Sequence, residues 1–436
     1  MTEMHNRPVR AKNEQRFQVE SPYRMSIPML ILTLVLICFG LIMLFSASMA
    51  TGYADADNPL YYVLKQGIFT ILGVAAATFI VFIPVKLYDR IGFVAFAYAV
   101  TLALVVYTKF AGIIDGGSRR WISIGSQRFQ PSEFAKIALI FCIAGYRSFI
   151  DRRRKAGKMK CKTARGQSYL DCIADIVIPV GLLMICLVFV LLQPHMSFFI
   201  IMTVISFICF LVAGIPLKSW IDGGLILILI TLVCGNVLML STTYTQQEKF
   251  MGNFEHVITR LNIFSTLNEE ETAAAAETES SSTATDDEVY QSKQSMIAIG
   301  SGGTSGVGFG SSRQKYQYLP AAHNDYVFSI ACEELGFIGG VSIIILFWAF
   351  LCGGLSIAWR AQSDFARILA VGYTCLIVIQ AAFNIAVSVG VIPPTGVTLP
   401  FFSYGGTANI FFLIAVGLVL AVSRTGVSRK KITYID

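Results

Sequence analysis

The sequence predicts an all-α integral membrane protein, a polytopic bundle of about ten transmembrane helices. Of its 436 residues, 55% are hydrophobic and only 14% are charged, and the mean hydropathy is +0.65. Soluble domains carry about 25% charged residues, so these charges are too few to cover a soluble surface of this size. The charges also cluster between long apolar runs, which a water-soluble chain could not hide from solvent.

Ten apolar runs are candidates for membrane spans. A spanning helix needs about 20 apolar residues, and a backbone in lipid must satisfy its own hydrogen bonds, so each run is predicted to be helical. The runs are 28–49, 64–84, 91–112, 131–149, 173–192, 197–213, 223–241, 326–352, 366–390 and 407–424.

The distribution of basic residues predicts the orientation. Most of the 34 Lys and Arg residues fall on alternate segments that begin with the N-terminal tail. Because basic residues favour the cytoplasmic side, both tails, 1–27 and 426–436, are predicted to be cytoplasmic and to flank a membrane domain over 28–425. No cleavable signal peptide is expected, since 1–27 is polar and basic and the first apolar run is long enough to span.

A large outer loop, 242–325, is predicted between spans 7 and 8. Within it, residues 268–288 (NEEETAAAAETESSSTATDDE) are low in complexity and lack Lys and Arg. Such a stretch cannot bury enough apolar surface to order itself, so it is predicted to be a flexible insertion.

Several other classes are disfavoured by the same composition. The net charge of +7 would suit nucleic acid, but the excess lies in short loops beside apolar runs, where it indicates topology. The ten cysteines and four histidines show no metal-ligand spacing, and most cysteines lie inside apolar runs. We therefore expect no nucleic-acid partner, no disulfide framework and no structural metal.

The first segment with chemistry is 115–136. Arg119 and Arg120 lie on the predicted outer side, where they either hold an anion or are ordinary solvated charges. Glu133 lies in the first turn of the fourth predicted span and Lys136 follows three residues later, so the two can pair. Lys136 is then either a lysine that reaches the interface beside a capping Glu133 or a cation that faces a polar substrate group.

The second segment is 291–340. Its glycine-rich loop over 300–310 lacks the pattern of a nucleotide-binding P-loop, and Arg313 and Lys315 follow it on the predicted outer side. Asp325 stands just before the eighth span, where it is either a general base with a tuned pKa or the N-cap of the helix. Glu333 and Glu334 lie deeper in that span, so each is expected to be functional or partnered.

The third segment is 384–410. Its prolines and glycines prevent a continuous helix, and irregular backbone at membrane depth is tolerated where protein buries it or where it lines a cavity. Ser403 and Tyr404 supply hydroxyl groups there. The segment is therefore predicted to be a re-entrant turn that can also line a cavity.

Together these three segments resemble the SEDS family (shape, elongation, division and sporulation). The matches are Arg119–Ile122 with Gln130–Lys136 to the RWI…QPSE(F)xK motif, Ala298–Gly339 to AIGSGG…EELGxxG, and Pro393–Gly406 to PxTGxxLPFxSYGG. The residues of the last two motifs are more similar to those of the FtsW and SpoVE members than to those of RodA. One departure is Gln193-Pro194-His195-Met196-Ser197, where the family has QPDxG.

The resemblance implies a peptidoglycan glycosyltransferase of the plasma membrane that polymerises lipid II on its outer face, in cell division or sporulation. By the match to the family's outer-loop aspartate, Asp325 is expected to be the general base of an inverting transfer. Arg119, Arg120, Lys136, Arg313 and Lys315 are expected to hold the undecaprenyl diphosphate, with Glu133, Ser403 and Tyr404 completing the substrate site.

The resemblance also implies partners. A class B penicillin-binding protein and other cell-wall or division proteins are expected to bind the chain. A divalent cation, Mg²⁺ or Mn²⁺, could accompany the diphosphate, although the sequence shows no dedicated cage for it. Two alternatives remain open: a flippase that moves lipid II across the bilayer, and a non-catalytic scaffold of the cell-wall machinery.

Overall fold

The computed structural model describes residues 25–115, 118–125, 127–193, 196–241, 283–316 and 318–425. The two tails therefore lie almost wholly outside the described residues. So do His195 and half of the predicted 242–325 loop, including 268–282 of its insertion. Residues 283–288, the end of that insertion, are helical and begin α11.

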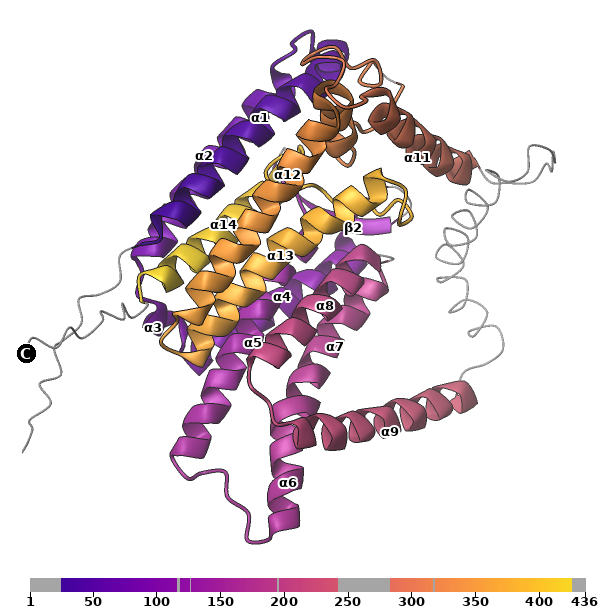
Figure 1. Cartoon of the computed structure of the whole chain (residues 1–436). Helices are drawn as coiled ribbons and strands as arrows, with labels where there is room; N and C mark the ends of the chain where they lie inside the picture. The colour runs from indigo at the N-terminus through magenta and orange to yellow at the C-terminus, as the bar shows by residue number, and fades with distance from the viewer. Residues whose placement is uncertain are drawn as a thin grey trace, which may run out of the picture.

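Helices dominate the described chain (Figure 1). Every run predicted to span is helical in the structure, because a continuous apolar stretch can satisfy its backbone only by internal bonds in lipid. The helices are α1 Ile27–Ala56, α2 Tyr61–Phe82, α3 Val85–Tyr88, α4 Ile91–Ala111, α5 Pro131–Lys155, α6 Ala164–Cys172, α7 Ile178–Leu191, α8 Met196–Val212, α9 Leu217–Ser241, α11 Thr283–Ser301, α12 Val327–Trp359, α13 Asp364–Ser388 and α14 Thr407–Ser423. A π-helical turn, η1 (Ile173–Val177), joins α6 to α7.

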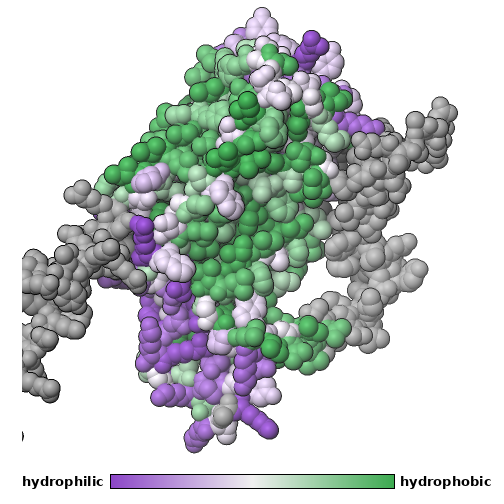
Figure 2. All heavy atoms as spheres, in the orientation of Figure 1, coloured by the Kyte–Doolittle hydropathy of each residue, from purple (hydrophilic) through white to green (hydrophobic). Residues whose placement is uncertain are grey.

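Within the described ranges, six helices are long and apolar enough to cross a membrane. They are α1, α2, α4, the continuous α6–α7 helix, α12 and α13, while α8 and α14 are shorter apolar helices. Hydrophobic residues cover the middle of the face of the bundle seen in Figure 2, and hydrophilic residues gather on the projecting ends of α5 and α6. These features make the chain a multi-pass membrane protein.

The predicted seventh span, 223–241, forms most of α9, which leaves the bundle at an angle (Figure 1). It packs on α6 and η1. Trp220 at its start contacts the rings of Phe207 and Phe210 on α8, with centroids 5.6 and 6.4 Å apart. The helix prediction is thus correct for this segment.

A small antiparallel sheet departs from the all-α prediction. It has the order β1-β2-β3, with β1 Ile113–Asp115, β2 Ser118–Ile124 and β3 Gln127–Phe129. The register pairs Ile113 with Trp121 and Ile122 with Phe129. The short segment between two spans turns at Gly125, whose φ of 63° suits a tight turn, and its strands satisfy their backbone as a hairpin. The sheet brings Arg120 and Arg128 to the end of α5.

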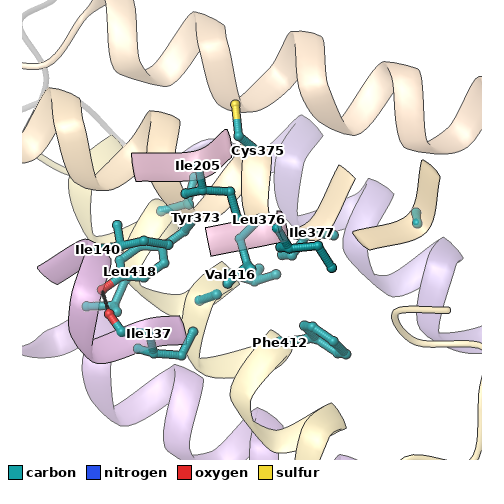
Figure 3. Packing of buried hydrophobic residues seen from close by; sticks show 14 of the residues in the cluster. Ile137, Ile140, Ile205, Tyr373, Cys375, Leu376, Ile377, Phe412, Val416 and Leu418 are labelled. Atoms are coloured by element: carbon teal, nitrogen blue, oxygen red, sulfur yellow. Dashed lines mark hydrogen bonds between the residues drawn. The ribbon is translucent and has the colours of Figure 1, made fainter. Parts of the chain in front are cut away.

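The core lies where α5, α8, α13 and α14 meet (Figure 3). Tyr373 on α13 is fully buried there, and its hydroxyl donates a 3.0 Å hydrogen bond to the carbonyl of Ile137 on α5. Leu376 of α13 and Val416 of α14 pack beside it. This contact ties α13 to α5 beside Lys136, and on α13 it lies two turns from Gln380.

Candidate active site

A cavity of about 500 Å³ opens at the end of the bundle where α5, α8 and α14 begin. Its lining is polar on most sides, although it lies among apolar helices. The residues come from α2, β2, β3, α5, α8, α13, α14 and the loops before α12 and α14: Lys65, Phe69, Arg120, Trp121, Arg128, Gln130, Glu133, Lys136, Ser197, Phe198, Ile201, Asn324, Asp325, Gln380, Gly396, Val397, Thr398, Tyr404, Gly405, Gly406, Thr407 and Ala408. We call it the reaction cavity.

Asp325 forms the acidic wall of the reaction cavity. Its backbone N–H and that of Asn324 both donate to the carbonyl of Ala321, which adopts a positive φ of 54°. This tight turn holds the acid just before α12. No described residue donates a hydrogen bond to its carboxylate or pairs with it, and burial raises the pKa of Asp325 to about 6. An unpaired carboxylate with this pKa is suited to accept a proton near neutral pH.

The N-cap alternative for Asp325 does not hold in the structure. Helix α12 begins at Val327, and the residue at its N-cap is Tyr326, which makes no side-chain capping hydrogen bond. Asp325 therefore stands one residue outside the cap, with its carboxyl group in the reaction cavity.

Lys136 and Glu133 also line the cavity, on the first turns of α5. The Lys136 ammonium lies 2.7 Å from each carboxylate oxygen of Glu133 and donates a 2.6 Å hydrogen bond to Oε1 of Gln380 on α13. Only 4% of Lys136 is exposed. Its side chain thus stays inside the protein and does not extend to the membrane surface.

Three further cations line the reaction cavity: Arg120 on β2, Arg128 on β3 and Lys65 on α2. The Arg120 guanidinium donates to the carbonyl of Gln193 at 3.3 Å, and the Lys65 ammonium donates to the Tyr61 hydroxyl at 2.5 Å. Lys65 was not among the predicted site residues. A single lysine within the first turns of an apolar run was the signal that could have indicated it.

Tyr404 closes one side of the cavity next to the turn that carries Asp325. Its backbone N–H donates to the carbonyl of His323 at 2.9 Å. The ring of Tyr62 lies 4.4 Å from His323 and 4.9 Å from Tyr404, between centroids. Burial lowers the pKa of His323 to about 4, so this imidazole is neutral at pH 7. The aromatic cluster fixes the 321–325 turn against the loop before α14.

Ser403, Arg119 and Arg313 are placed outside the lining of the reaction cavity. The Ser403 hydroxyl accepts a 2.8 Å hydrogen bond from the backbone N–H of Leu399, so it stabilises the turn. Arg119 is exposed, and its guanidinium donates to the carbonyl of Phe110 at 2.6 Å. Arg313 is also exposed. The structure therefore does not bring these three predicted substrate-binding residues together with Asp325.

Lys315 lies in a second charged cluster, which we call the closed cluster: Ser46, Ser312, Lys315, Glu333 and Glu334. The Lys315 ammonium donates to Glu334 at 3.0 Å, to the carbonyl of Gly310 at 2.6 Å and to the Ser46 hydroxyl at 3.2 Å. The side chains of Lys315 and Glu334 are both 0% exposed. This ammonium was expected to hold the diphosphate, and the structure instead buries it against a carboxylate.

Glu333 and Glu334 are both partnered inside the closed cluster. Glu333 accepts hydrogen bonds from the Ser312 hydroxyl and from the backbone N–H of Arg313, the latter at 2.9 Å. Glu334 accepts from the Ser46 hydroxyl at 2.6 Å. These two acids were expected to be either functional or partnered. In the structure both are partnered, because hydrogen-bond donors compensate each buried charge.

The glycine-rich loop docks into a break in α12. At Gly336, φ is 69° and ψ is −167°, which interrupts the helix, and the N–H groups of Val307 and Gly308 bond the carbonyls of Glu333 and Glu334 at 3.0 and 3.1 Å. A Cβ added at Gly306 would lie 2.1 Å from the Glu334 carbonyl oxygen. The motif thus provides close backbone packing, since only glycine permits both this approach and these dihedral angles.

The sequence model of the FtsW, RodA and SpoVE family, described as "Cell cycle protein", matches residues 27–427. Stage V sporulation protein E of Bacillus subtilis (strain 168) is 33% identical over 397 residues, which cover 91% of this chain and 96% of that protein. A protein of Marinobacter nauticus named "Probable peptidoglycan glycosyltransferase FtsW" is 30% identical over 410 residues, covering 93% and 91%.

Two solved structures share the fold. A chain from "Structural coordination of polymerization and crosslinking by a peptidoglycan synthase complex" superimposes with a TM-score of 0.61 at 23% identity, covering 92% of this chain and 98% of its own length. The rod shape determining protein RodA of Thermus thermophilus gives a TM-score of 0.58 at 23% identity, covering 92% and 97%.

Proposed function

The chain belongs to the FtsW, RodA and SpoVE family of cell cycle proteins, also called SEDS proteins, and on that premise we propose that the reaction cavity is where it polymerises lipid II. The chain is a peptidoglycan glycosyltransferase, as its curated relatives are named, and the prediction of the family is confirmed. The observation that carries the choice of site is the unpaired carboxylate of Asp325, which lines one cavity together with Lys136, Lys65, Arg120 and Arg128.

Asp325 is the proposed general base. The acceptor sugar's 4-hydroxyl oxygen bonds to the anomeric carbon of the donor, the bond from that carbon to the diphosphate oxygen breaks, and the hydroxyl proton moves to Asp325. An α-linked donor then yields a β-linked product by a single displacement. A pKa of about 6 leaves most of the carboxylate ionised at pH 7 and makes it a stronger base than an ordinary aspartate.

The cations that line the cavity with Asp325 are the proposed site for the leaving diphosphate. Negative charge develops on the diphosphate as its bond to the sugar breaks, and fixed cations in a partly desolvated cavity stabilise that charge. Lys136, Arg120, Lys65 and Arg128 line the cavity, so they replace Arg119, Arg313 and Lys315 in this role. Glu133 and Gln380 orient the Lys136 ammonium, and Tyr404 lies beside the acceptor.

The same assignment includes the membrane orientation. We place the reaction cavity at the outer face of the plasma membrane and both tails, 1–27 and 426–436, in the cytoplasm. The catalytic domain then comprises residues 28–425. The exposed apolar helices then give the polyprenyl tail of the substrate a lipid environment beside the cavity. A class B penicillin-binding protein is the proposed partner, which agrees with the peptidoglycan synthase complex in which one structural relative was solved.

A divalent cation in this cavity would depend mainly on the substrate for ligands. Among the described residues, no group of three or more His, Cys, Asp or Glu side chains could hold a metal ion. Glu133 is engaged by Lys136, which leaves Asp325 as the cavity's unpaired carboxylate. A Mg²⁺ or Mn²⁺ ion would therefore be carried in with the diphosphate oxygens, which suit such hard cations.

Purified protein with its partner, given fluorescent lipid II, tests the proposal. Wild type is expected to produce glycan ladders and Asp325→Asn to produce none. A wild-type protein that moves lipid II across liposome membranes but makes no polymer would support a flippase instead. If Asp325→Ala restores growth to cells that lack the protein, a non-catalytic scaffold is the better account.

A further inference from the structure

We propose that Asn384 on α13 is a positioning residue that fixes Asp325 by holding the two chain segments on either side of its carboxyl group. This inference rests on the proposed function, because it assigns a role through Asp325. Asn384 does not line the reaction cavity and lies 59 residues from the acid along the chain.

The geometry of Asn384 is that of a clamp between two loops. Its amide nitrogen donates one hydrogen bond to the backbone carbonyl of Asp325 and one to that of Val397, both at 2.7 Å. The side chain is 1% exposed. Both amide N–H groups are therefore used, and the two acceptors belong to two separate segments, the turn before α12 and the loop that follows α13.

The amide oxygen of Asn384 is buried without a hydrogen-bond partner among the described residues. A rotated amide would place this oxygen against the two carbonyls, so the donors can serve both segments in only one orientation. An unsatisfied buried oxygen is unfavourable. Retaining an asparagine here, where an apolar residue would leave no such atom, indicates that its two donors do something that packing alone would not.

The two segments held by Asn384 are the ones that flank the acid. Asp325 lies on the first. On the second, Gly396 precedes Val397 with a φ of 65°, and a Cβ added there would lie 3.9 Å from Oδ2 of Asp325. Fixing the Asp325 and Val397 carbonyls therefore fixes both the origin of the carboxyl side chain and the wall that it faces.

A second amide on the same face of α13 contacts Lys136 and the residue after Val397. Gln380 lies one helical turn from Asn384, accepts from the Lys136 ammonium at 2.6 Å, and donates to the carbonyl of Thr398 at 3.3 Å. The two amides thus set the separation between the base on one loop and the cation on α5. Reacting groups that are displaced by about 1 Å can lose about 10²-fold in rate.

Substitutions of Asn384 should change the position of the Asp325 carboxyl group without changing the charges around it. The titratable and charged groups that face or adjoin the acid are Lys136 and Glu133 on α5, Lys65 on α2, Arg120 on β2, Arg128 on β3, Tyr404 on the following loop and His323 on its own turn. Because Asn384 is itself neutral, a shift in the acid limb of the pH profile after its replacement by a neutral residue reports the surroundings of Asp325.

The experiment measures kcat, KM and the pH–rate profile of lipid II polymerisation by full-length Asn384→Leu and Asn384→Ser. Leucine removes both donors at similar size, and serine retains at most one. We expect kcat to fall about 10- to 100-fold for Asn384→Leu and less for Asn384→Ser, with KM within about threefold of wild type. The acid limb should move below pH 6, because a released loop exposes the carboxylate to water.

Asn409→Leu is the matched control. Asn409 is also a buried asparagine on a neighbouring helix, where its amide donates to the Thr70 hydroxyl at 2.8 Å, and it should leave the pH profile unchanged. If Asn384→Leu and Asn384→Ser only lower the yield of folded protein, or keep the wild-type kcat and acid limb while Asp325→Asn is inactive, the role of Asn384 is refuted. If Asp325→Asn polymerises lipid II at a rate close to that of wild type, the proposed function itself fails.

Discussion

The reaction cavity and the closed cluster contain the same kinds of residue and differ in what surrounds them. Each combines a lysine with carboxylates near the same end of the bundle. In the closed cluster, Lys315 and Glu334 are both 0% exposed and neutralise one another at 3.0 Å. In the reaction cavity, Lys136 is also paired, with Glu133, but Asp325 has no partner among the described residues and borders open space.

The difference teaches that an intramembrane charge is structural when its partners saturate it and available for chemistry when they do not. Removing one partner of a buried ion pair leaves the other charge uncompensated inside the protein, so the substitution mainly lowers stability. A buried ion pair is therefore weak evidence for a catalytic role. A lone carboxylate in a cavity has the opposite properties, since its raised pKa makes it a candidate base. Substitutions in the two regions should therefore affect different quantities.

Asp325→Asn should have the largest effect on catalysis. Asparagine keeps the size of the side chain and cannot accept the proton as a carboxylate does, so kcat should fall by about 10²–10⁴-fold, the usual contribution of a general base. Single-turnover polymerisation of lipid II measures this loss. The thermal midpoint of unfolding should not fall, because the change removes an unpaired buried charge.

Lys315→Met should have the largest effect on stability. It leaves Glu334 as an uncompensated buried carboxylate, which costs about 3–5 kcal/mol of unfolding free energy. The double variant Lys315→Met with Glu334→Gln should recover much of that stability, and its rate per folded molecule should stay within about threefold of wild type. A double variant that folds but has lost polymerisation would place the closed cluster in the mechanism.

Lys136→Met should reduce both the catalytic efficiency, kcat/KM, and the stability of the fold. Loss of a cation from the cavity should lower kcat/KM about 10- to 100-fold, and Glu133 would be left without its partner. Combining it with Glu133→Gln removes the uncompensated charge, so stability should return while kcat/KM stays low. Recovery of activity along with stability would show that Lys136 is structural, like Lys315.

Arg313→Ala should have the smallest effect. Its side chain is exposed and does not line the cavity. Its hydrogen bond to Glu333 is donated by the backbone N–H, which alanine keeps. Polymerisation should change by less than about twofold. A loss of tenfold or more in kcat/KM would return Arg313 to the diphosphate site predicted from the sequence.

The helices could be predicted well because apolar length alone specifies them in lipid. The pairing of Lys136 with Glu133 was also predictable, since three residues on one helix turn bring them together. The small sheet was missed because its strands are only three to seven residues long. Lys65 was missed because nothing local links it to Asp325, and Arg128 was left out of the diphosphate site although it follows Arg119 and Arg120 on the same predicted outer segment.

Lys315 shows why the rest of the site could not be predicted. Its partner Glu334 lies 19 residues away and Ser46 lies 269 residues away, so its burial depends on how α1 and the glycine-rich loop meet at the break in α12. Nothing in the residues around position 315 distinguishes a cation held in this way from one that faces a substrate.

The most direct test of the central claim is the pH dependence of kcat for lipid II polymerisation by the wild type, measured beside Asp325→Asn. A base must be ionised to accept a proton, so the wild-type rate should rise with pH through an apparent pKa near 6 and then level off. The residual rate of Asp325→Asn should lack this limb. If the variant retains the same limb, or the wild-type rate falls as pH rises through 6, Asp325 is not the base.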